Sequence, residues 1–264
     1  MRFKFGDNWS NFLGLVNESR VSSSKESLKK MLGIDDLKGK SVLDIGSGSG
    51  LTSLAARQLG ANVVSFDYDK ASVECTKKLR DSYYPLDEKW SVSQGSVLDD
   101  KFMSSIGDFD VVISWGVLHH TGDMWKALEN VYELTEKNEG ILYIALYNDQ
   151  GFISSYWRII KKLYHFNRIT KYIVIVAHYP YLVTAPYIVR KLTGRGTKDR
   201  GMSLWYDLLD WVGGYPFEVV SIDRVKSFFS NDYKLINFVD VGKRHGCNEF
   251  VFQRKNKLSD SESK

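Results

Sequence analysis

An acidic residue followed by three alternate glycines is the pattern with the most chemical content in this chain. Asp44 precedes Gly46, Gly48 and Gly50, and an apolar run over 41–45 leads into them. Glycine adopts positive φ and lets the backbone approach a ligand closely, so this spacing at a strand-to-helix junction indicates a nucleotide-binding turn. A dinucleotide site would place its third glycine one residue later, which disfavours a pyrophosphate ligand.

A second carboxylate follows at the distance that such a fold uses for a ribose. Asp67 ends the strand-like run 62–66, twenty-one residues after Gly46, where a carboxylate accepts both ribose hydroxyls. Tyr68 comes next and is suited to lie against an adenine ring. Because Asp44 suits a ligand with an ammonium and a sulfonium group better than one with phosphates, the pattern indicates S-adenosylmethionine.

The run from Val42 to Gly50 resembles motif I of the class I S-adenosylmethionine-dependent methyltransferases. Segments 200–218 and 246–252 are also similar to a bacterial group related to the ubiquinone-pathway O-methyltransferases. The resemblance implies S-adenosyl-L-methionine as cofactor, bound by residues at the strand ends: Asp44, Gly46, Ser47, Gly48, Gly50, Asp67, Tyr68, Ser96, Val97 and Trp115.

Two positions depart from the family pattern. Ser96 stands where an aspartate usually meets the adenine amino group, and a serine can accept that hydrogen bond but supplies no charge. The ubiquinone-type enzymes have an acid where His119 stands, which speaks against a quinone acceptor.

Paired histidines follow the fourth expected strand, in the loop that borders the transferred methyl group in the family. His119 is our candidate general base and His120 the alternative, because imidazole exchanges protons near neutral pH. The same pair could instead cap the turn and satisfy nearby carbonyls.

The elements that must position these groups recur at βα spacing. The pattern predicts an α/β fold: a doubly wound, seven-stranded, mostly parallel sheet, Rossmann-like, with an antiparallel C-terminal hairpin and a helical insertion. We expect an N-terminal helical segment at 1–39, a catalytic domain at 40–147 and 219–254, an insertion at 148–218 and a flexible tail at 255–264.

The expected insertion is basic, apolar and aromatic. Residues 151–200 carry ten Lys or Arg and one acid, a net charge of +9 against +4 for the whole chain. The stretch 172–189 has no charged residue, and its two prolines predict two short helices that pack on the core or lie at an interface. We expect a lid that receives an anionic or lipid-linked acceptor and that contacts a membrane peripherally through 152–192. Its candidate substrate-binding residues are Trp205, Asp207, Asp210 and Tyr215.

Composition narrows the class of protein. The chain is 43% hydrophobic and 26% charged, as in soluble domains. Its first residues hold no apolar stretch of signal-peptide length, and Cys75 and Cys247 have no zinc-type spacing. We therefore expect a cytoplasmic, metal-free enzyme, with peripheral contact at the inner membrane face.

The functional expectation is S-adenosylmethionine-dependent O-methylation of a small-molecule, sugar or lipid-linked acceptor. An RNA methyltransferase would account for the basic insertion, but the run 114–117 lacks the Asn/Asp-Pro-Pro-Tyr pattern of enzymes that methylate amino groups, which makes a nucleic acid the weaker alternative. A non-catalytic cofactor-binding subunit is the third reading. The oligomeric state stays open.

Overall fold

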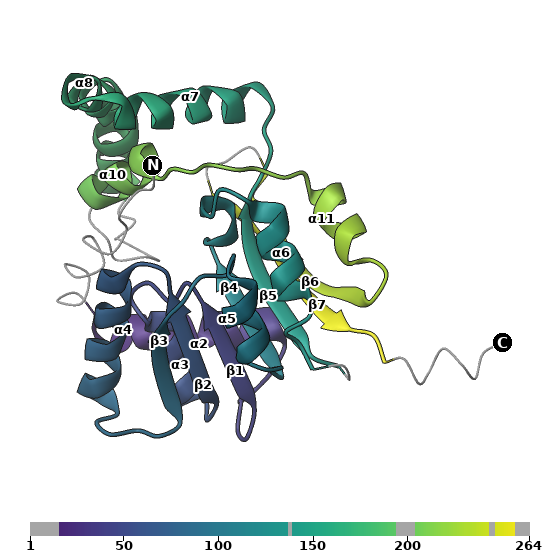
Figure 1. Ribbon diagram of the computed structural model, residues 1–264. Helices are drawn as coiled ribbons and strands as arrows, with labels where there is room; N and C mark the ends of the chain where they lie inside the picture. The colour runs from purple at the N-terminus through teal and green to yellow at the C-terminus, as the bar shows by residue number, and fades with distance from the viewer. Residues whose placement is uncertain (1–15, 137–138, 194–203, 243–245, 257–264) are drawn as a thin grey trace.

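The computed structural model describes residues 16–136, 139–193, 204–242 and 246–256, and a single sheet forms its centre (Figure 1). The strand order is β3-β2-β1-β4-β5-β7-β6, with β7 antiparallel to both neighbours and the other pairs parallel. This confirms the predicted seven-stranded, mostly parallel sheet with an antiparallel hairpin. The strands are β1 Ser41–Ile45, β2 Asn62–Asp67, β3 Trp90–Gln94, β4 Val111–Trp115, β5 Ile141–Tyr147, β6 Tyr233–Val239 and β7 Cys247–Arg254.

Helices cover both faces of the sheet because successive strand residues point to opposite sides. In β1, Val42 packs with residues of α2, α3 and α4, whereas Leu43 packs with residues of α5, α6 and α11. The strands are therefore buried on both faces, as a doubly wound fold requires. The six helices are α2 Glu18–Leu32, α3 Leu51–Gln58, α4 Lys70–Tyr83, α5 Asp100–Ser105, α6 Met124–Tyr132 and α11 Ile222–Phe229.

Aspartates cap the N-termini of three of these helices. Asp69 accepts the Ala71 N–H at 2.8 Å at the start of α4, and Asp123 accepts the Lys126 N–H at 3.2 Å at the start of α6. Asp99 does the same for α5. Such caps satisfy N–H groups that have no partner within the helix, so the polypeptide turns sharply from strand into helix. The connecting loops are thereby held at the carboxyl edge of the sheet.

The segment between β5 and α11 forms a helical layer at that edge (Figure 1). Its helices share a small apolar core and reach the sheet through Tyr147 at the end of β5. The elements are α7 Phe152–Phe166, α8 Arg168–Tyr179, the π-helical turn η2 Pro180–Thr184, α9 Ala185–Thr193 and α10 Leu204–Gly213. The small core consists of Trp157, Tyr164, Val174, Ile175, Leu208, Val212 and Phe217.

The two prolines interrupt this layer less than expected. Residues 168–189 form one helical run, in which Pro180 opens the π-helical turn and Pro186 lies in the first turn of α9. Proline lacks an N–H and its ring crowds the preceding turn, and a wider π turn accommodates both defects without ending the helix. The predicted pair of separate short helices is therefore one helical run with a local widening.

Candidate active site

The glycine turn is pressed between the ends of two neighbouring strands. Gly46, Gly48 and Gly50 have φ of 75°, 56° and 80°, values that side chains strongly disfavour. The Gly46 N–H donates to the Phe66 carbonyl at 2.8 Å, and a Cβ on Gly46 would lie 2.5 Å from the Val117 side chain. The turn therefore needs glycine at this position, and it lies against the loop that carries the histidine pair.

Asp67 fixes the turn from the end of β2. One carboxylate oxygen accepts the Gly48 N–H at 3.0 Å and the other accepts the Asp69 N–H at 2.8 Å. These two bonds orient the carboxylate. The predicted ribose carboxylate is thus held rigidly beside the glycine turn.

Asp44 lies deeper than the other acidic residue of the site. Its side chain is buried, and the Ser53 hydroxyl of α3 donates to it at 2.5 Å. Ser53 in turn pairs with Ser65 of β2 at 2.8 Å. Burial raises the pKa of the Asp44 carboxyl to about 6. Its role in orienting the ammonium group stays a prediction, and its visible contact braces β1 against α3.

The residues predicted to meet the adenine come from two strand ends. Tyr68, after β2, exposes 55% of its surface, and Gln94 at the end of β3 donates its side-chain amide to the Tyr68 carbonyl at 3.0 Å. Val97 is buried in the core, so its side chain is not available at the surface. Trp115 ends β4 and is partly buried on the face of the sheet that α2, α3 and α4 cover, opposite to the face where Val97 lies.

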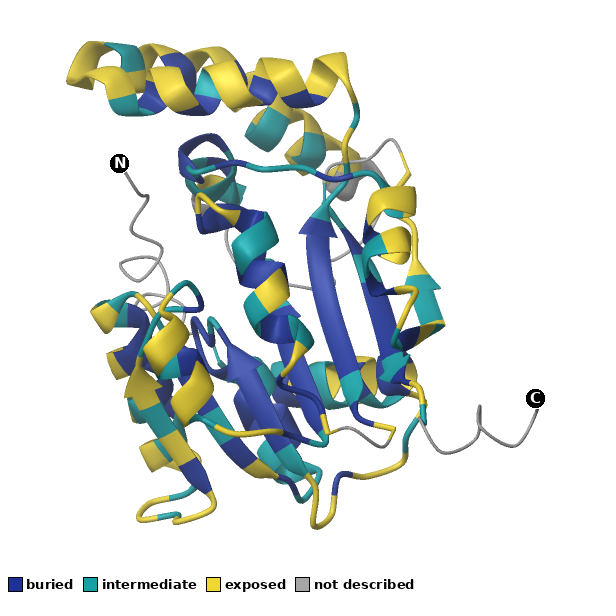
Figure 2. Ribbon diagram, turned by 45° about the vertical axis from the view of Figure 1, so that its right-hand side comes forward, coloured by how far each residue is buried: buried dark blue, intermediate teal, exposed yellow. Residues whose placement is uncertain are grey.

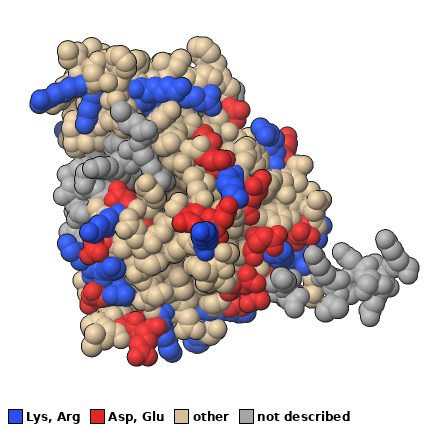
Figure 3. Space-filling view, in the orientation of Figure 1, with Lys and Arg blue, Asp and Glu red and all other residues tan. Residues whose placement is uncertain are grey.

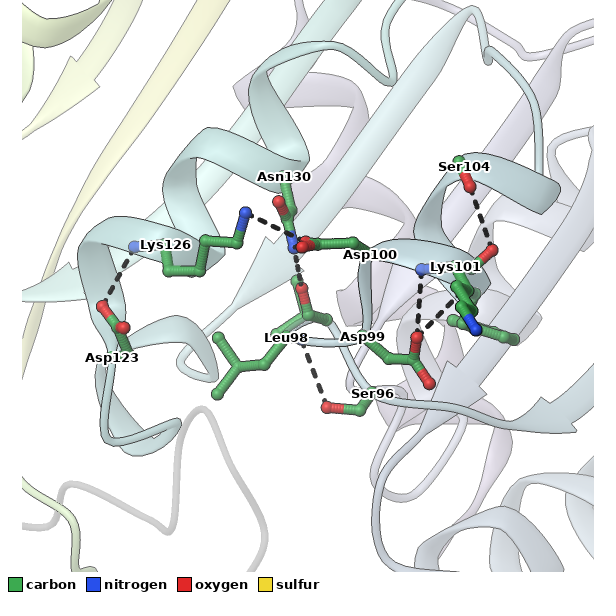
Figure 4. Close-up of polar contacts among 11 residues, drawn as sticks. Ser96, Leu98, Asp99, Asp100, Lys101, Ser104, Asp123, Lys126 and Asn130 are labelled. Carbon is green, nitrogen blue, oxygen red and sulfur yellow. Dashed lines mark hydrogen bonds and ion pairs between the residues drawn. The ribbon is translucent and has the colours of Figure 1, made fainter.

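Polar contacts fasten the loop after β3 to helix α6 (Figure 4). The Ser96 hydroxyl accepts the Leu98 N–H at 3.2 Å, so the serine closes a local turn and keeps its own proton to donate. Asn130 of α6 donates to the Val97 carbonyl at 2.8 Å and to Asp100 at 3.0 Å. Helix α6, through Asn130, therefore holds the loop that would border the adenine.

His119 lies in the short 3₁₀ turn Leu118–His120 after β4 and is fully buried. Its Nδ1 accepts the Tyr147 N–H at 3.3 Å, which assigns the proton of the neutral ring to Nε2. Nε2 has no hydrogen-bond partner among the described residues. Burial, together with the nearby His120 and Lys161, holds the His119 pKa well below its usual value. His119 is thus a neutral ring with one buried N–H.

His120 has the opposite arrangement. Its Nδ1 lies 2.6 Å from the carbonyl oxygen of Pro216. A carbonyl can only accept, so Nδ1 carries the proton and the basic lone pair of the neutral ring is at Nε2. The two histidine rings contact each other edge to face, with centroids 4.5 Å apart.

Aromatic residues of the helical layer pack above the histidine pair. The ring centroids of Tyr147 and His119 are 3.9 Å apart. The ring centroids of Trp211 and Phe217 lie 5.5 and 5.2 Å from that of Tyr147. The Lys161 ammonium of α7 is 4.8 Å from both of those rings and donates to the Trp211 carbonyl. Burial lowers the Lys161 pKa to about 7.

The end of the helical layer is tied to the histidine loop by Glu218. Its backbone N–H donates to the His119 carbonyl at 3.1 Å, and its carboxylate accepts the Met124 N–H at 3.1 Å. Burial raises the Glu218 pKa. Because Pro216 and Glu218 both contact the histidine turn, the layer positions that turn.

Of the four predicted substrate residues, Trp205, Asp207 and Asp210 lie on α10 and Tyr215 follows shortly after it. Trp205 is 43% exposed and lies near Tyr179 of α8, with ring centroids 6.3 Å apart. Tyr215 faces His165 at 6.0 Å. Asp207 and Asp210 are half-buried on α10. In α10, the ring that contacts Tyr147 is that of Trp211.

Sequence reasoning missed Tyr147, Lys161, Trp211, Phe217 and Glu218. Tyr147 ends a strand at the same sheet edge as Asp67, so its position could have identified it. The other four come close to the histidine loop only through the packing of the helical layer, and no spacing in the sequence signals this.

Metal ligation has no candidate among the described residues. No group of three or more His, Cys, Asp or Glu side chains gathers in the part of the chain that the structure describes. Cys75 is buried and Cys247 is half-buried, and no disulfide joins them.

Comparison with known proteins places these features in a family. A family model described as a methyltransferase domain matches residues 19–183. The ubiquinone biosynthesis O-methyltransferase of Pelagibacter ubique is 32% identical over 135 residues, which are 51% of this chain and 49% of that protein. The ribosomal protein L11 methyltransferase of Helicobacter hepaticus is 30% identical over 111 residues, 42% of this chain and 32% of that protein. The chain thus matches half or less of these curated relatives.

A solved structure extends the likeness to nearly the whole fold. Magnesium protoporphyrin IX methyltransferase from Synechocystis, with bound SAH, superposes with a TM-score of 0.54 over 91% of this chain and 89% of that one, at 13% identity. Identity this low supports the fold alone. The oriented Asp67 carboxylate, the exposed Tyr68 ring and the close-packed glycine turn fit the ribose, adenine and methionine parts of S-adenosylmethionine. The chain belongs to the methyltransferase domain family, and its fold and motifs are those of the class I S-adenosylmethionine-dependent methyltransferases.

Proposed function

We propose that the protein methylates an oxygen atom of a small-molecule, sugar or lipid-linked acceptor. One observation carries the proposal: the glycine turn touches the histidine loop, since a Cβ on Gly46 would meet Val117, two residues before His119. This contact supports a proton acceptor in the histidine loop, close to the cofactor turn. The Pelagibacter relative, named an O-methyltransferase, supports an oxygen acceptor.

S-adenosylmethionine, when bound, supplies an activated methyl group, so the chain has to bind, align and remove a proton. Asp67 would hold the ribose hydroxyls, Tyr68 would lie against the adenine and Ser96 would hydrogen-bond its edge. The glycine turn would leave room for the methionine part, with Asp44 behind it.

We assign the general base to His120 in place of the sequence-based candidate His119. With Nδ1–H donated to Pro216, His120 offers Nε2 to an acceptor hydroxyl. His119 uses Nδ1 as an acceptor for the Tyr147 N–H, and its burial opposes the charged form that a base must reach.

The test is transfer of labelled methyl from S-adenosylmethionine into fractionated cell extract. The wild type and Asp67→Ala are compared, because loss of the ribose contact should remove the signal without changing the extract. Label in the small-molecule or lipid fraction, dependent on Asp67, supports the proposal. Label in RNA or protein would contradict the acceptor class. Cofactor binding without label in any fraction would favour the non-catalytic subunit.

A further inference from the structure

Helix α7 has two apolar faces, which a helix of a self-contained domain does not need. Its buried face consists of Ser154, Trp157, Lys161 and Tyr164. The opposite face is also apolar, and its residues recur at three- and four-residue spacing, so they form one stripe. Their exposed fractions run from 40% for Leu163 to 86% for Phe152. This α7 stripe consists of Phe152, Tyr156, Ile159, Leu163 and Phe166.

Helix α8 continues the same exposed apolar surface. Val174, Ile175 and His178 face the small core, while the outer side is apolar and uncovered. The helical run Arg168–Val189 contains an 18-residue stretch that is long and apolar enough to cross a membrane, and 17% of that stretch is buried. Figure 2 shows the outer side of these helices as exposed, in contrast to the buried strands below. The α8 stripe consists of Ile169, Tyr172, Ile173, Val176 and Tyr179.

The charged side chains on α7 and α8 themselves are all positive. Residues 150–198 contain no Asp or Glu. Arg158, Lys162, Arg168 and Lys171 are exposed on α7 and α8. In Figure 3, Lys and Arg side chains form a row across the helical layer, and uncharged surface lies above that row. An apolar surface bordered by long basic side chains matches the boundary between acyl chains and anionic headgroups.

We propose that α7 and α8 dock the protein on an anionic lipid bilayer, with both helices lying in the plane of the interface. The α7 and α8 stripes would enter the acyl boundary while Arg158, Lys162 and Arg168 meet the lipid phosphates. The helices do not cross the bilayer, because Trp157, Val174 and Ile175 hold their inner sides on the core of the helical layer.

Charge argues against a second copy of the chain as the occupant. Two copies joined through these stripes would bring the basic side chains of their α7 and α8 helices together, and these side chains would repel each other. An anionic bilayer complements both the apolar and the basic part of the surface. The docking surface is separate from the glycine turn, so the inference does not depend on the methyl acceptor.

Vesicle co-sedimentation tests the proposal. The full chain is mixed with vesicles of phosphatidylcholine alone or of equal parts phosphatidylcholine and phosphatidylglycerol. We expect the wild type to pellet with the phosphatidylglycerol vesicles. Phe152→Ser/Ile159→Ser/Phe166→Ser should lower partitioning at least about tenfold, because three apolar side chains leave the acyl boundary. The matched control, Leu86→Ser/Ile236→Ser/Val239→Ser, removes exposed apolar side chains of the catalytic domain and should pellet like the wild type.

A second pair of variants isolates the charge. Arg158→Gln/Lys162→Gln/Arg168→Gln should weaken binding to phosphatidylglycerol vesicles at least about tenfold, and salt should weaken the wild type in the same direction. The control Lys78→Gln/Lys89→Gln/Lys101→Gln changes exposed lysines of the catalytic domain and should bind normally. Circular dichroism confirms that each variant folds.

Three results would overturn the proposal. The wild type could remain in the supernatant with both kinds of vesicle, or the α7 variant could pellet as the wild type does. The wild type could also form a dimer in light scattering that the α7 variant abolishes, which would assign the stripes to a second copy.

Discussion

The helices α6 and α7 differ in what they leave uncovered. In α6 the buried side is apolar, with Met124, Ala127, Leu128 and Val131, and the outer side carries Lys126 and Glu129. In α7 both sides are apolar. The catalytic sheet therefore completes its own core, whereas the helical layer exposes an apolar surface in the part of the chain that the structure describes. The chemistry of the cofactor site belongs to the first region and the proposed membrane attachment to the second.

The largest expected effect is a loss of methyl transfer with no change in vesicle binding. His120→Ala should lower methyl transfer by about 10² to 10⁴, because the proton acceptor is lost. Affinity for S-adenosylhomocysteine and vesicle binding should stay near the wild-type values, since His120 is placed in neither surface. Initial rates with the acceptor found in extract provide the measurement. A rate for His120→Ala equal to that of the wild type, with His119→Ala inactive, would return the role to His119.

The next prediction tests whether the small core of the helical layer unfolds separately from the core around the sheet. Trp157 is buried in the small core of the helical layer and contacts Trp211, with ring centroids 5.4 Å apart. Trp157→Ala should cost about 3 to 5 kcal/mol within that layer. Hydrogen exchange should rise in 152–193 and 204–213 and stay unchanged in α3. Equal acceleration in α3 would mean that the two regions unfold as one unit, and the comparison would fail.

A smaller effect concerns the buried cation of the helical layer. The Lys161 pKa is about 7 in the folded protein against 10.5 as the ordinary value. Between these two pKa values the unfolded chain binds the proton and the folded chain does not, so the free energy of unfolding rises with pH across this window. Below the folded-state pKa both states bind the proton, and Lys161 adds no pH dependence. The slope is at most about 1.4 kcal/mol per pH unit.

Lys161→Met should remove this pH dependence and stabilise the protein at pH 7. Denaturant unfolding at pH 7 to 10 measures the slope. Lys162→Met is the matched control, because the neighbouring lysine is exposed, and it should keep the wild-type slope. A wild-type stability that falls from pH 7 to 10 would contradict the buried neutral amine.

The sheet and the glycine turn follow from local patterns in the sequence. Apolar runs such as Val42–Ile45, Asp67 at a strand end and aspartate caps each act over a few residues, so their spacing predicts both the fold and the cofactor edge. The catalytic assignment depends on contacts from distant residues. His119 and His120 are adjacent in the chain, and the Tyr147 N–H and the Pro216 carbonyl give them different tautomers.

The helical layer shows the same limit. Its basic and aromatic character is visible in the sequence, but which side of α7 is uncovered depends on how it packs with α8 and α10. The predicted substrate residues Trp205 and Tyr215 were chosen by type, and packing brings Trp211 to Tyr147 instead. Residue preferences likewise did not predict the π-helical turn at Pro180.

Titration calorimetry with S-adenosylhomocysteine tests the central claim, that the cofactor site is the glycine turn and Asp67 of the catalytic sheet. Asp67→Ala should weaken binding at least about tenfold, because charged hydrogen bonds to the ribose are lost. The α7 variant Phe152→Ser/Ile159→Ser/Phe166→Ser should bind as the wild type does, and thermal melting confirms that Asp67→Ala is folded. Wild-type affinity in a folded Asp67→Ala protein would contradict the account.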